Sequence, residues 1–377
     1  MLFPILRDQL KFLSQSGFEI HTASIDGPLA RRLHDLDGYP FTPLPLTREI
    51  APLKDWRALK WIENFLREQR FTIVHTHTPK GNVIGQWAAR RAGVPIVLQT
   101  LHGFYLHDRM PWWKRKLWLS IERFSASHSD HVLCQNPEDV QTAIGERVVA
   151  QDRISLLGNG IDLQKFTPPD AERRARIRDQ LGIAPDARVV GMAGRFVAEK
   201  GFPEFIAAGG LLTSRDPKVH LLAVGLHQTS ERSSEAWIPP SSTHKNMTLL
   251  TNRDDMADLY ACMDVHVLPS HREGFPRTLM EGAATGLPQV CTNIRGCRQT
   301  VEDGVTGFHV EVGDVQGLAA RILRLLEDDT LRQMMGHAAR AKALAEFDQR
   351  SVFKKVETTY RRLLAAHRLE LEANEKK

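Results

Sequence analysis

Two carboxylates close to a predicted helix start are the first residues that could do chemistry. The segment 268–290 reads LPSHREGFPRTLMEGAATGLPQV and places Glu273 and Glu281 eight residues apart. Pro276 between them suits a first helical turn, where its missing N–H would be unpaired anyway. The pair could be surface charge, an acid/base pair, or two clamps on sugar and ribose hydroxyls. Because one precedes the helix and the other lies along it, the spacing favours two clamps on one extended ligand.

The backbone at the same helix start also suits an anion. The N–H groups of Gly274, Phe275 and Arg277 precede the first helical hydrogen bonds, so we expect them to meet a phosphate or sugar oxygen. For Glu273 alone, compensation of the helix dipole remains an equal alternative.

A cationic motif lies upstream. The segment 191–205, GMAGRFVAEKGFPEF, ends a predicted strand at Gly194 and presents Arg195 and Lys200 before the next helix. Arginine offers a planar fork and lysine a point charge, and both suit a diphosphate. Taken alone, the motif fits a strand-to-loop turn with solvated charges equally well.

Short apolar runs alternate with helical patterns and must position these motifs. Strands are predicted at 18–24, 71–77, 95–102, 130–136 and 153–159, then at 188–195, 220–226, 247–252, 265–270 and 288–293, with helices at 55–69, 112–127, 203–213, 277–286 and 315–327. This alternation predicts an α/β protein of two doubly wound, Rossmann-like domains. In such sheets, ligands bind beyond the carboxyl ends of the strands, which is where the motifs fall.

The domain limits follow from the turn-rich segment 158–170, which reads as a linker. We predict an N-terminal acceptor-binding domain at 1–165 and a nucleotide-sugar-binding domain at 166–345. A C-terminal segment at 346–377 is predicted to be helical and to pack back towards the N-terminal domain.

Composition narrows the classes of function. The 377 residues are 42% hydrophobic and 25% charged with net charge +5, which is typical of a globular protein with an anionic ligand or membrane partner. No apolar run reaches the roughly 18 residues of a membrane span. Four cysteines without a C-x-x-C pair predict reduced thiols, a cytoplasmic location and no structural zinc. No nucleic-acid-binding signature is present.

The combination of motifs resembles a known family. G-R-x4-K-G at 194–201 followed by E-G-F-P-x4-E at 273–281 is similar to the retaining family 4 glycosyltransferases, which have the two-domain GT-B fold with a cleft between the domains. The resemblance continues through DMADLYACMDVHVLPS before the second motif and GLPQVCTNIRGCRQTVEDGVTGFHVEVGD after it. It implies that Glu273 binds the donor hexose and Glu281 the ribose, while Arg195 and Lys200 hold the diphosphate. It implies a nucleotide-diphospho-sugar donor, no cofactor and no metal.

The first half resembles relatives in exopolysaccharide and O-antigen assembly. The similarity covers 73–108, IVHTHTPKGNVIGQWAARRAGVPIVLQTLHGFYLHD. It implies that His102 lies near the donor sugar as a catalytic residue, and that His77, Lys80 and His102 bind the acceptor. A histidine in a strand is usually structural, and for His77 that interpretation stays open.

A basic, aromatic helix follows. The segment 107–124, HDRMPWWKRKLWLSIERF, carries Trp112, Trp113 and Trp118 at helical spacing among basic residues. It predicts either an interfacial membrane anchor or a helix whose aromatics pack in the core. The basic residues are Arg109, Lys114, Arg115 and Lys116.

One departure from the family concerns the N-terminus. Relatives begin with a strand and a small-residue loop, whereas Met1 here already stands at the first helix. The N-terminal domain is therefore expected to lack its first strand, which would leave two neighbouring strands unpaired. A late start site, a truncation and a sheet repaired in another way are the alternatives.

These observations predict a retaining glycosyltransferase. The expected reaction moves a hexose from a nucleotide-diphospho-sugar to a polyprenyl-diphosphate-linked saccharide in surface polysaccharide biosynthesis, at the cytoplasmic face of the inner membrane. The alternatives are a catalytically impaired nucleotide-sugar-binding protein and a nucleotide-sugar epimerase of the same fold.

Overall fold

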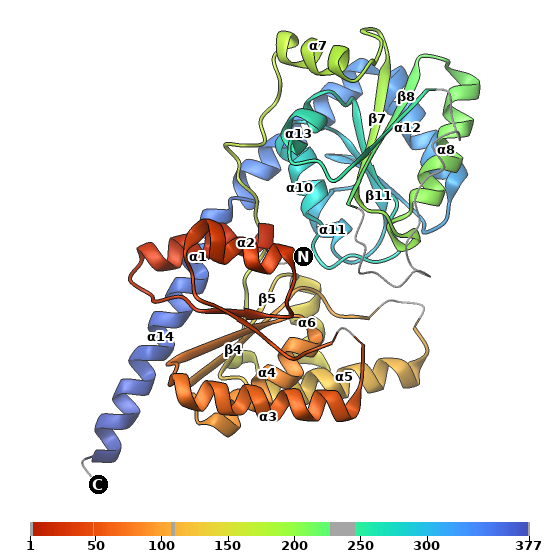
Figure 1. Ribbon diagram of the computed structural model, residues 1–377. Helices are drawn as coiled ribbons and strands as arrows, with labels where there is room; N and C mark the ends of the chain where they lie inside the picture. The colour runs from red at the N-terminus through yellow and green to blue at the C-terminus, as the bar shows by residue number, and fades with distance from the viewer. Residues whose placement is uncertain (1–2, 48, 107–109, 227–245, 376–377) are drawn as a thin grey trace. The chain divides into compact units, whose positions relative to one another are not determined.

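The chain folds as two units (Figure 1). A computed structural model describes residues 3–47, 49–106, 110–226 and 246–375. Unit 1 comprises Met1–Gly158 with Arg350–Lys377, and unit 2 comprises Asn159–Gln349. The divisions fall after residues 158 and 349, a few residues from the predicted 165 and 345.

Unit 2 is a doubly wound α/β domain. Its helices are α7 (Ala171–Gln180), α8 (Phe202–Arg215), α9 (Met256–Ala261), α10 (Arg277–Ala284), α11 (Cys297–Thr300), α12 (Val315–Glu327) and α13 (Asp329–Glu346), with a 3-10 turn at Ala198–Lys200. Its strands are β7 (Arg188–Arg195), β8 (Val219–Leu226), β9 (Met247–Thr251), β10 (Val265–Leu268), β11 (Gln289–Thr292) and β12 (Gly307–Val310). The predicted strands correspond to β7 through β11, whereas β12 was not predicted.

The strand order creates a switch point. The six parallel strands lie in the order β9-β8-β7-β10-β11-β12, so the chain runs outward from β7 and then returns to place β10 on the other side of β7. Helices that follow β7 and β10 therefore diverge, and a crevice opens at the carboxyl ends of these two strands. Both sequence motifs follow directly after these ends.

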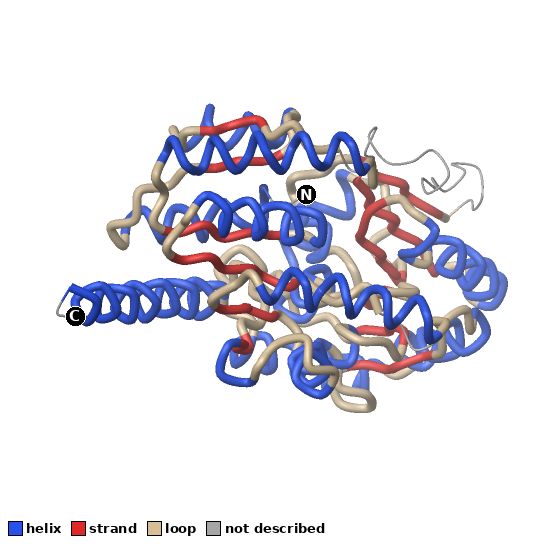
Figure 2. Tube along the Cα trace, turned by 90° about the horizontal axis from the view of Figure 1, so that it is seen from below, coloured by secondary structure: helices blue, strands red, loops and turns tan. Residues whose placement is uncertain are grey.

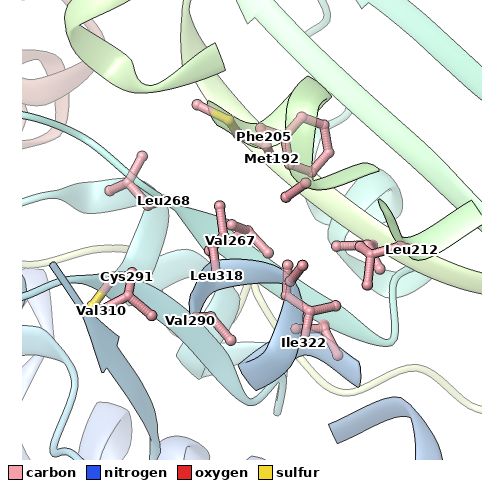
Figure 3. Close-up of a cluster of buried hydrophobic side chains, with 14 of the residues drawn as sticks. Met192, Phe205, Leu212, Val267, Leu268, Val290, Cys291, Val310, Leu318 and Ile322 are labelled. Carbon is pink, nitrogen blue, oxygen red and sulfur yellow. The ribbon is translucent and has the colours of Figure 1, made fainter. Parts of the chain in front are cut away.

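The apolar residues of unit 2 form two buried clusters, which hold the sheet and its helices together. Strands covered by helices on both faces are continuously apolar, and Met192 of β7 and Val267 of β10 are both fully buried. Helix α12 adds Leu318, Ile322 and Leu325 at i, i+4 and i+7, which places them on one face against the sheet. Figure 3 shows several of these side chains meeting in one cluster.

Unit 1 contains two parallel sheets. Its helices are α1 (Phe3–Gln15), α2 (Pro28–Asp37), α3 (Pro52–Gln69), α4 (Pro79–Ala92), α5 (Trp112–Ser127), α6 (Pro137–Gly145) and α14 (Gln349–Glu375). Its strands are β1 (Thr22–Ser24), β2 (Phe41–Pro43), β3 (Ile73–His77), β4 (Ile96–Leu101), β5 (His131–Cys134) and β6 (Ile154–Leu156). β1 pairs with β2, and β3-β4-β5-β6 form the larger sheet; within the described ranges no ladder joins β1 to β3.

The C-terminal helix packs on unit 1. Figure 2 shows α14 as one long helix that leads to the C-terminus. Its Phe353, Val356 and Tyr360 share a buried cluster with Leu98 of β4 and Leu13 of α1. None of the described helices is long and apolar enough to cross a membrane.

One glycine allows the two motif loops of unit 2 to touch. Gly201 has φ +84°, in the left-handed region that favours glycine. A Cβ atom on it would lie 2.1 Å from the carbonyl oxygen of Pro269, in the loop after β10. Any side chain at this position would therefore separate the loops.

We expect Gly201→Ala to destabilise the protein by about 3 kcal/mol or more, because a backbone clash adds to the cost of the left-handed conformation. Gly182→Ala is the matched control: φ is +66°, but nothing lies within 4 Å of its Cβ position. It should cost only the conformational part, about 1 kcal/mol. Thermal unfolding of the full chain measures both, and equal drops in the apparent Tm would contradict a tight contact between the loops.

Candidate functional site

A poorly exposed ion pair joins the two motif loops at the switch point. Lys200 Nζ lies 2.6 Å from Glu273 Oε1, and the two side chains are only 18% and 8% exposed. The hydroxyl of Ser270 lies 2.8 Å from the same carboxylate oxygen and 3.2 Å from the carbonyl oxygen of Lys200. Glu273 Oε2 has no hydrogen-bond partner within the described ranges, so it could accept one from a ligand hydroxyl.

Further contacts hold the same two loops together. Arg272 Nε donates to Glu199 Oε1 at 2.8 Å, and the backbone N–H of His271 donates to the carbonyl oxygen of Glu199 at 2.8 Å. The ring of His271 also lies 2.6 Å from a carboxylate oxygen of Glu204 in α8. Burial acts to raise the pKa of Glu199, but the guanidinium of Arg272 and the nearby charges of Lys200 and Arg195 together outweigh it, and the pKa is lowered. Glu199 is therefore held as a carboxylate.

The second predicted carboxylate lies inside α10. Tyr260 of α9 donates its hydroxyl hydrogen to Glu281 Oε2 at 3.1 Å, and Arg277 Nε lies 4.0 Å from Oε1. The Glu281 side chain is 14% exposed. Burial raises its pKa, and the nearby Arg277 only partly opposes this shift. The contacts leave Oε1 as the oxygen with capacity for a ligand.

The remaining predicted donor residues lie at the end of β7 and in the loop after β10. Gly194 and Arg195 end β7. Gly274 belongs to the loop after β10, and its carbonyl oxygen lies 2.5 Å from the Cβ position of Gly296, which precedes α11. Since Gly296 has φ +80°, glycine there lets a third loop approach the site.

Phe275 has a structural contact, and Pro276 precedes the first turn of α10. The Phe275 ring packs on Phe347 with centroids 6.3 Å apart, and its carbonyl accepts a hydrogen bond from Asn159 at 3.1 Å. Helix α10 starts at Arg277, and Pro276 occupies the cap position instead of the first turn. The prediction for Pro276 was thus wrong by one residue, because its backbone is extended.

In unit 1, the predicted histidines form a chain of hydrogen bonds. His102 Nδ1 lies 3.1 Å from Gln135 Oε1, which can only accept, so Nδ1 carries the proton. His102 Nε2 then accepts from His77 Nδ1–H at 3.0 Å. This leaves Nε2 of His77 as a lone-pair nitrogen with no partner in the described parts of the chain. Burial lowers the pKa of both rings and keeps them neutral.

A third histidine is structural. His75 is held between the hydroxyls of Tyr360 and Thr100, both at 2.7 Å. Burial lowers its pKa to about 3. Because both ring nitrogens are engaged, His75 ties α14 to the sheet of unit 1.

Lys80 lies at the start of α4 and is engaged by the protein. Its ammonium pairs with Asp55 at 2.6 Å and donates to the carbonyl oxygens of Thr47 at 2.6 Å and Glu49 at 2.5 Å. Its charge is thus paired with a carboxylate, and two of its three N–H donors meet carbonyl oxygens of the chain. A role of Lys80 in acceptor binding stays a prediction, and it would require these contacts to be exchanged.

No group of three or more His, Cys, Asp or Glu side chains is placed to hold a metal ion in the described part of the chain. Metal independence itself stays a prediction. Arg109, predicted to belong to the basic helix, lies outside the described residues.

Comparison with known proteins identifies the family. The family model "Glycosyl transferases group 1" matches residues 173–342, and "Glycosyl transferase 4-like domain" matches residues 6–160. A UDP-Gal:alpha-D-GlcNAc-diphosphoundecaprenol alpha-1,3-galactosyltransferase of Escherichia coli is 30% identical over 86% of this chain and 84% of its own length. The chain belongs to the group 1 glycosyltransferases. It is therefore an enzyme that transfers a glycosyl group.

Other relatives agree with this assignment. The capsular polysaccharide biosynthesis glycosyltransferase CapM of Staphylococcus aureus is 29% identical over 96% of this chain and 94% of its own. Among solved structures, Anabaena HepE in complex with UDP and glucose has a TM-score of 0.76 at 21% identity, covering 94% of this chain and 95% of that one. Sucrose-phosphate synthase from Thermosynechococcus elongatus has a TM-score of 0.77 at 22% identity, covering 96% and 93%. The predicted GT-B fold is confirmed.

Sequence reasoning missed the residues that support the predicted ones. Ser270 and Arg272 lie inside the quoted motif, but only the structure shows Ser270 on Glu273 and Arg272 on Glu199. Tyr260 is fully buried and reads as core in the sequence, yet its hydroxyl holds Glu281. A buried tyrosine needs a partner for its hydroxyl, and this is the signal that could have found it.

Lys200→Ala should destabilise the fold by about 2 kcal/mol or more, because it leaves a poorly exposed carboxylate without its cation. Lys218→Ala is the control, since Lys218 pairs with Asp186 in water, with both side chains more than 60% exposed, and should show no measurable change. Chemical or thermal unfolding of the full chain compares the variants. Equal stability of Lys200→Ala and the parent would show that the ion pair does not hold the loops.

Proposed function

We propose that this glycosyltransferase moves a hexose from a nucleoside-diphosphate sugar to a saccharide carried on polyprenyl diphosphate, with retention of anomeric configuration and without a metal ion. The observation that carries the proposal is the poorly exposed Lys200–Glu273 pair at the switch point of unit 2, where α/β sheets bind nucleotides. The pair supplies a cation for phosphate and a carboxylate for sugar hydroxyls from neighbouring strand ends.

The cations account for bond cleavage. As the glycosidic bond breaks, negative charge grows on the leaving nucleoside diphosphate. Lys200 uses one of its three N–H donors on Glu273, so two can meet phosphate oxygens. Arg195 ends the neighbouring strand and would supply the second positive charge. Fixed cations aimed at growing charge lower the barrier without a metal.

The two carboxylates orient the donor. Glu273 Oε1 is already occupied by Lys200 and Ser270, so Oε2 would accept from a hexose hydroxyl. Glu281 is fixed by Tyr260 through Oε2, which leaves Oε1 to accept from a ribose hydroxyl. The loop carrying Gly274 and Phe275 would bring backbone donors to the phosphates or sugar.

Unit 1 would bind the acceptor. His77 offers Nε2 as a neutral acceptor of a hydrogen bond from a sugar hydroxyl, and His102 fixes the tautomer that makes this possible. The galactosyltransferase relative is named for an acceptor on diphosphoundecaprenol, and the CapM relative for capsular polysaccharide biosynthesis. The first name supports a lipid-linked acceptor. Peripheral association of α5 with an anionic membrane, and action at its cytoplasmic face, are further parts of the proposal, and they follow from such an acceptor.

A thermal-shift panel of UDP-, GDP- and ADP-sugars followed by a transfer assay tests the proposal. A donor at about 100 times its Kd should add about 2.7 kcal/mol to the stability of the folded state. Transfer from that donor to a polyprenyl-diphosphate saccharide, with the anomeric configuration read by NMR, completes the test. Binding with neither transfer nor hydrolysis would instead favour a donor-binding protein without activity, and release of an epimerised sugar would favour an epimerase.

Variants of Lys200 separate catalysis from binding. Lys200→Ala should lower kcat by about a hundredfold or more, because charge stabilisation in the transition state is lost, while donor affinity changes less. Lys200→Arg keeps the charge and should recover part of the rate. Full activity of Lys200→Ala in the same transfer assay would remove Lys200 from the mechanism.

The raised pKa of Glu281 predicts the pH dependence of donor binding. The ribose clamp needs the ionised carboxylate as acceptor, so affinity should fall as the pH drops through a pKa above the ordinary glutamate value. Calorimetric titration between about pH 5 and pH 8 measures this fall. Glu281→Gln is the control, because it should bind more weakly at high pH and lack this step. An identical pH profile in the two proteins would exclude Glu281 as the titrating group.

A further inference from the structure

Helix α5 has an exposed apolar stripe. Trp113, Leu117 and Phe124 follow one another at four and seven residues, which places them on one face of a helix. Their exposed fractions are 53%, 55% and 41%. Large apolar side chains that line up in water mark an interaction surface more often than isolated ones do.

Helix α3 carries a second stripe of the same kind. Leu53 and Trp56 are three residues apart and 79% and 46% exposed. Lys60, one turn further along the same face, lies 5.4 Å from the centre of the Trp56 ring. A cation over an indole ring combines the two side chains that favour the boundary between water and lipid.

Helix α4 joins the two stripes into one surface. Its Trp87 contacts Trp56 of α3, with ring centroids 5.9 Å apart, and Phe124 of α5, with centroids 5.7 Å apart. Figure 1 shows α3, α4 and α5 on one side of the four-stranded sheet of unit 1. An aromatic row therefore crosses all three helices.

The three helices that form this surface are strongly basic. The three helices together contain eleven Lys and Arg residues against four Asp and Glu residues, a net charge of +7, while the whole chain carries +5. At the edge formed by α5, Lys114 lies 5.3 Å from the Trp113 ring and Lys116 lies 5.1 Å from the Trp112 ring. Long basic side chains can lie along apolar surface while their charges remain in water.

We propose that the outer face of α3, α4 and α5 is a docking surface for an anionic lipid bilayer. The surface combines exposed tryptophans, which favour the interfacial zone, with a positive charge that attracts anionic headgroups. A second copy of the chain is a poor fit, because the basic side chains of two such surfaces would repel each other. The proposal rests on the proposed function in one respect: docking would bring unit 1 to a lipid-linked acceptor.

Vesicle flotation of the full chain tests the surface without any assay of transfer. The vesicles contain either phosphatidylcholine alone or phosphatidylcholine with about a third phosphatidylglycerol, at low salt and at roughly 0.5 M salt. We expect flotation only with the anionic vesicles, and loss of flotation at high salt. Equal binding to neutral vesicles, or no binding to either, would overturn the proposal.

Two double variants test whether both outer helices take part. Leu53→Ala with Trp56→Ala removes the α3 stripe, and Trp113→Ala with Leu117→Ala removes the α5 stripe. Each should weaken partitioning at least about tenfold, because apolar area is lost from the bilayer contact. If only the α5 variant weakens binding, α5 alone is the anchor and the three-helix surface is wrong.

The matched control is Trp61→Ala. Trp61 lies in α3, is 41% exposed, and stacks on Phe65 with centroids 5.6 Å apart. Five residues from Trp56, it lies on a different side of the helix. Its replacement should leave flotation unchanged, and a loss equal to that of the α3 variant would show that the stripe has no special role.

The charge is tested separately. Lys60→Gln with Lys116→Gln keeps the aromatic row and should weaken partitioning about thirtyfold, at about 1 kcal/mol for each lysine near an anionic surface. Sedimentation over a range of protein concentrations checks the alternative occupant. Reversible self-association that the α3 and α5 variants abolish would assign the surface to a second copy and overturn the membrane proposal.

Discussion

The ion pair between Lys200 and Glu273 is the contact on which the site of unit 2 depends. The two residues lie 73 positions apart and belong to loops after different strands. They meet because β10 returns to the side of β7 and because Gly201 lets the backbone of one loop touch that of the other. The strand order, the glycine and the paired charges therefore depend on one another, and a change to any of them disturbs the others.

Much of this arrangement could be predicted from the sequence, because it depends on local patterns. Apolar runs located β7 to β11, and the motif spacing placed Arg195, Lys200, Glu273 and Glu281 after the correct elements. The partners could not be predicted, since pairing of Lys200 with Glu273, and not with Glu199, depends on how two loops fold against each other. β12 was not predicted, although it has the same length as β10 and β11.

The basic helix shows how one sequence pattern can satisfy two structural roles. The sequence left open whether the aromatics of α5 pack in the core or face an interface. Leu119 and Ala126 are buried in unit 1, and Trp118 packs against the same cluster, whereas Trp112 and Trp113 are 70% and 53% exposed. Core packing is therefore confirmed for one face of the helix, whereas membrane association of the exposed face stays a proposal. Periodicity alone could not separate the faces, because tryptophans occur on both.

The paired charges also fix the position of Glu273 in the site. A carboxylate with 8% exposure and no partner would lose much of its hydration, which costs free energy. Lys200 removes this penalty, while Ser270 adds a hydrogen bond, so Glu273 stays fixed before any ligand arrives. A diphosphate that enters can then share Lys200 without creating an unpaired buried charge, because the ammonium has two further donors. The ground state is thus stabilised by the same cation that would meet charge developing on a leaving phosphate, and little reorganisation is needed between the two.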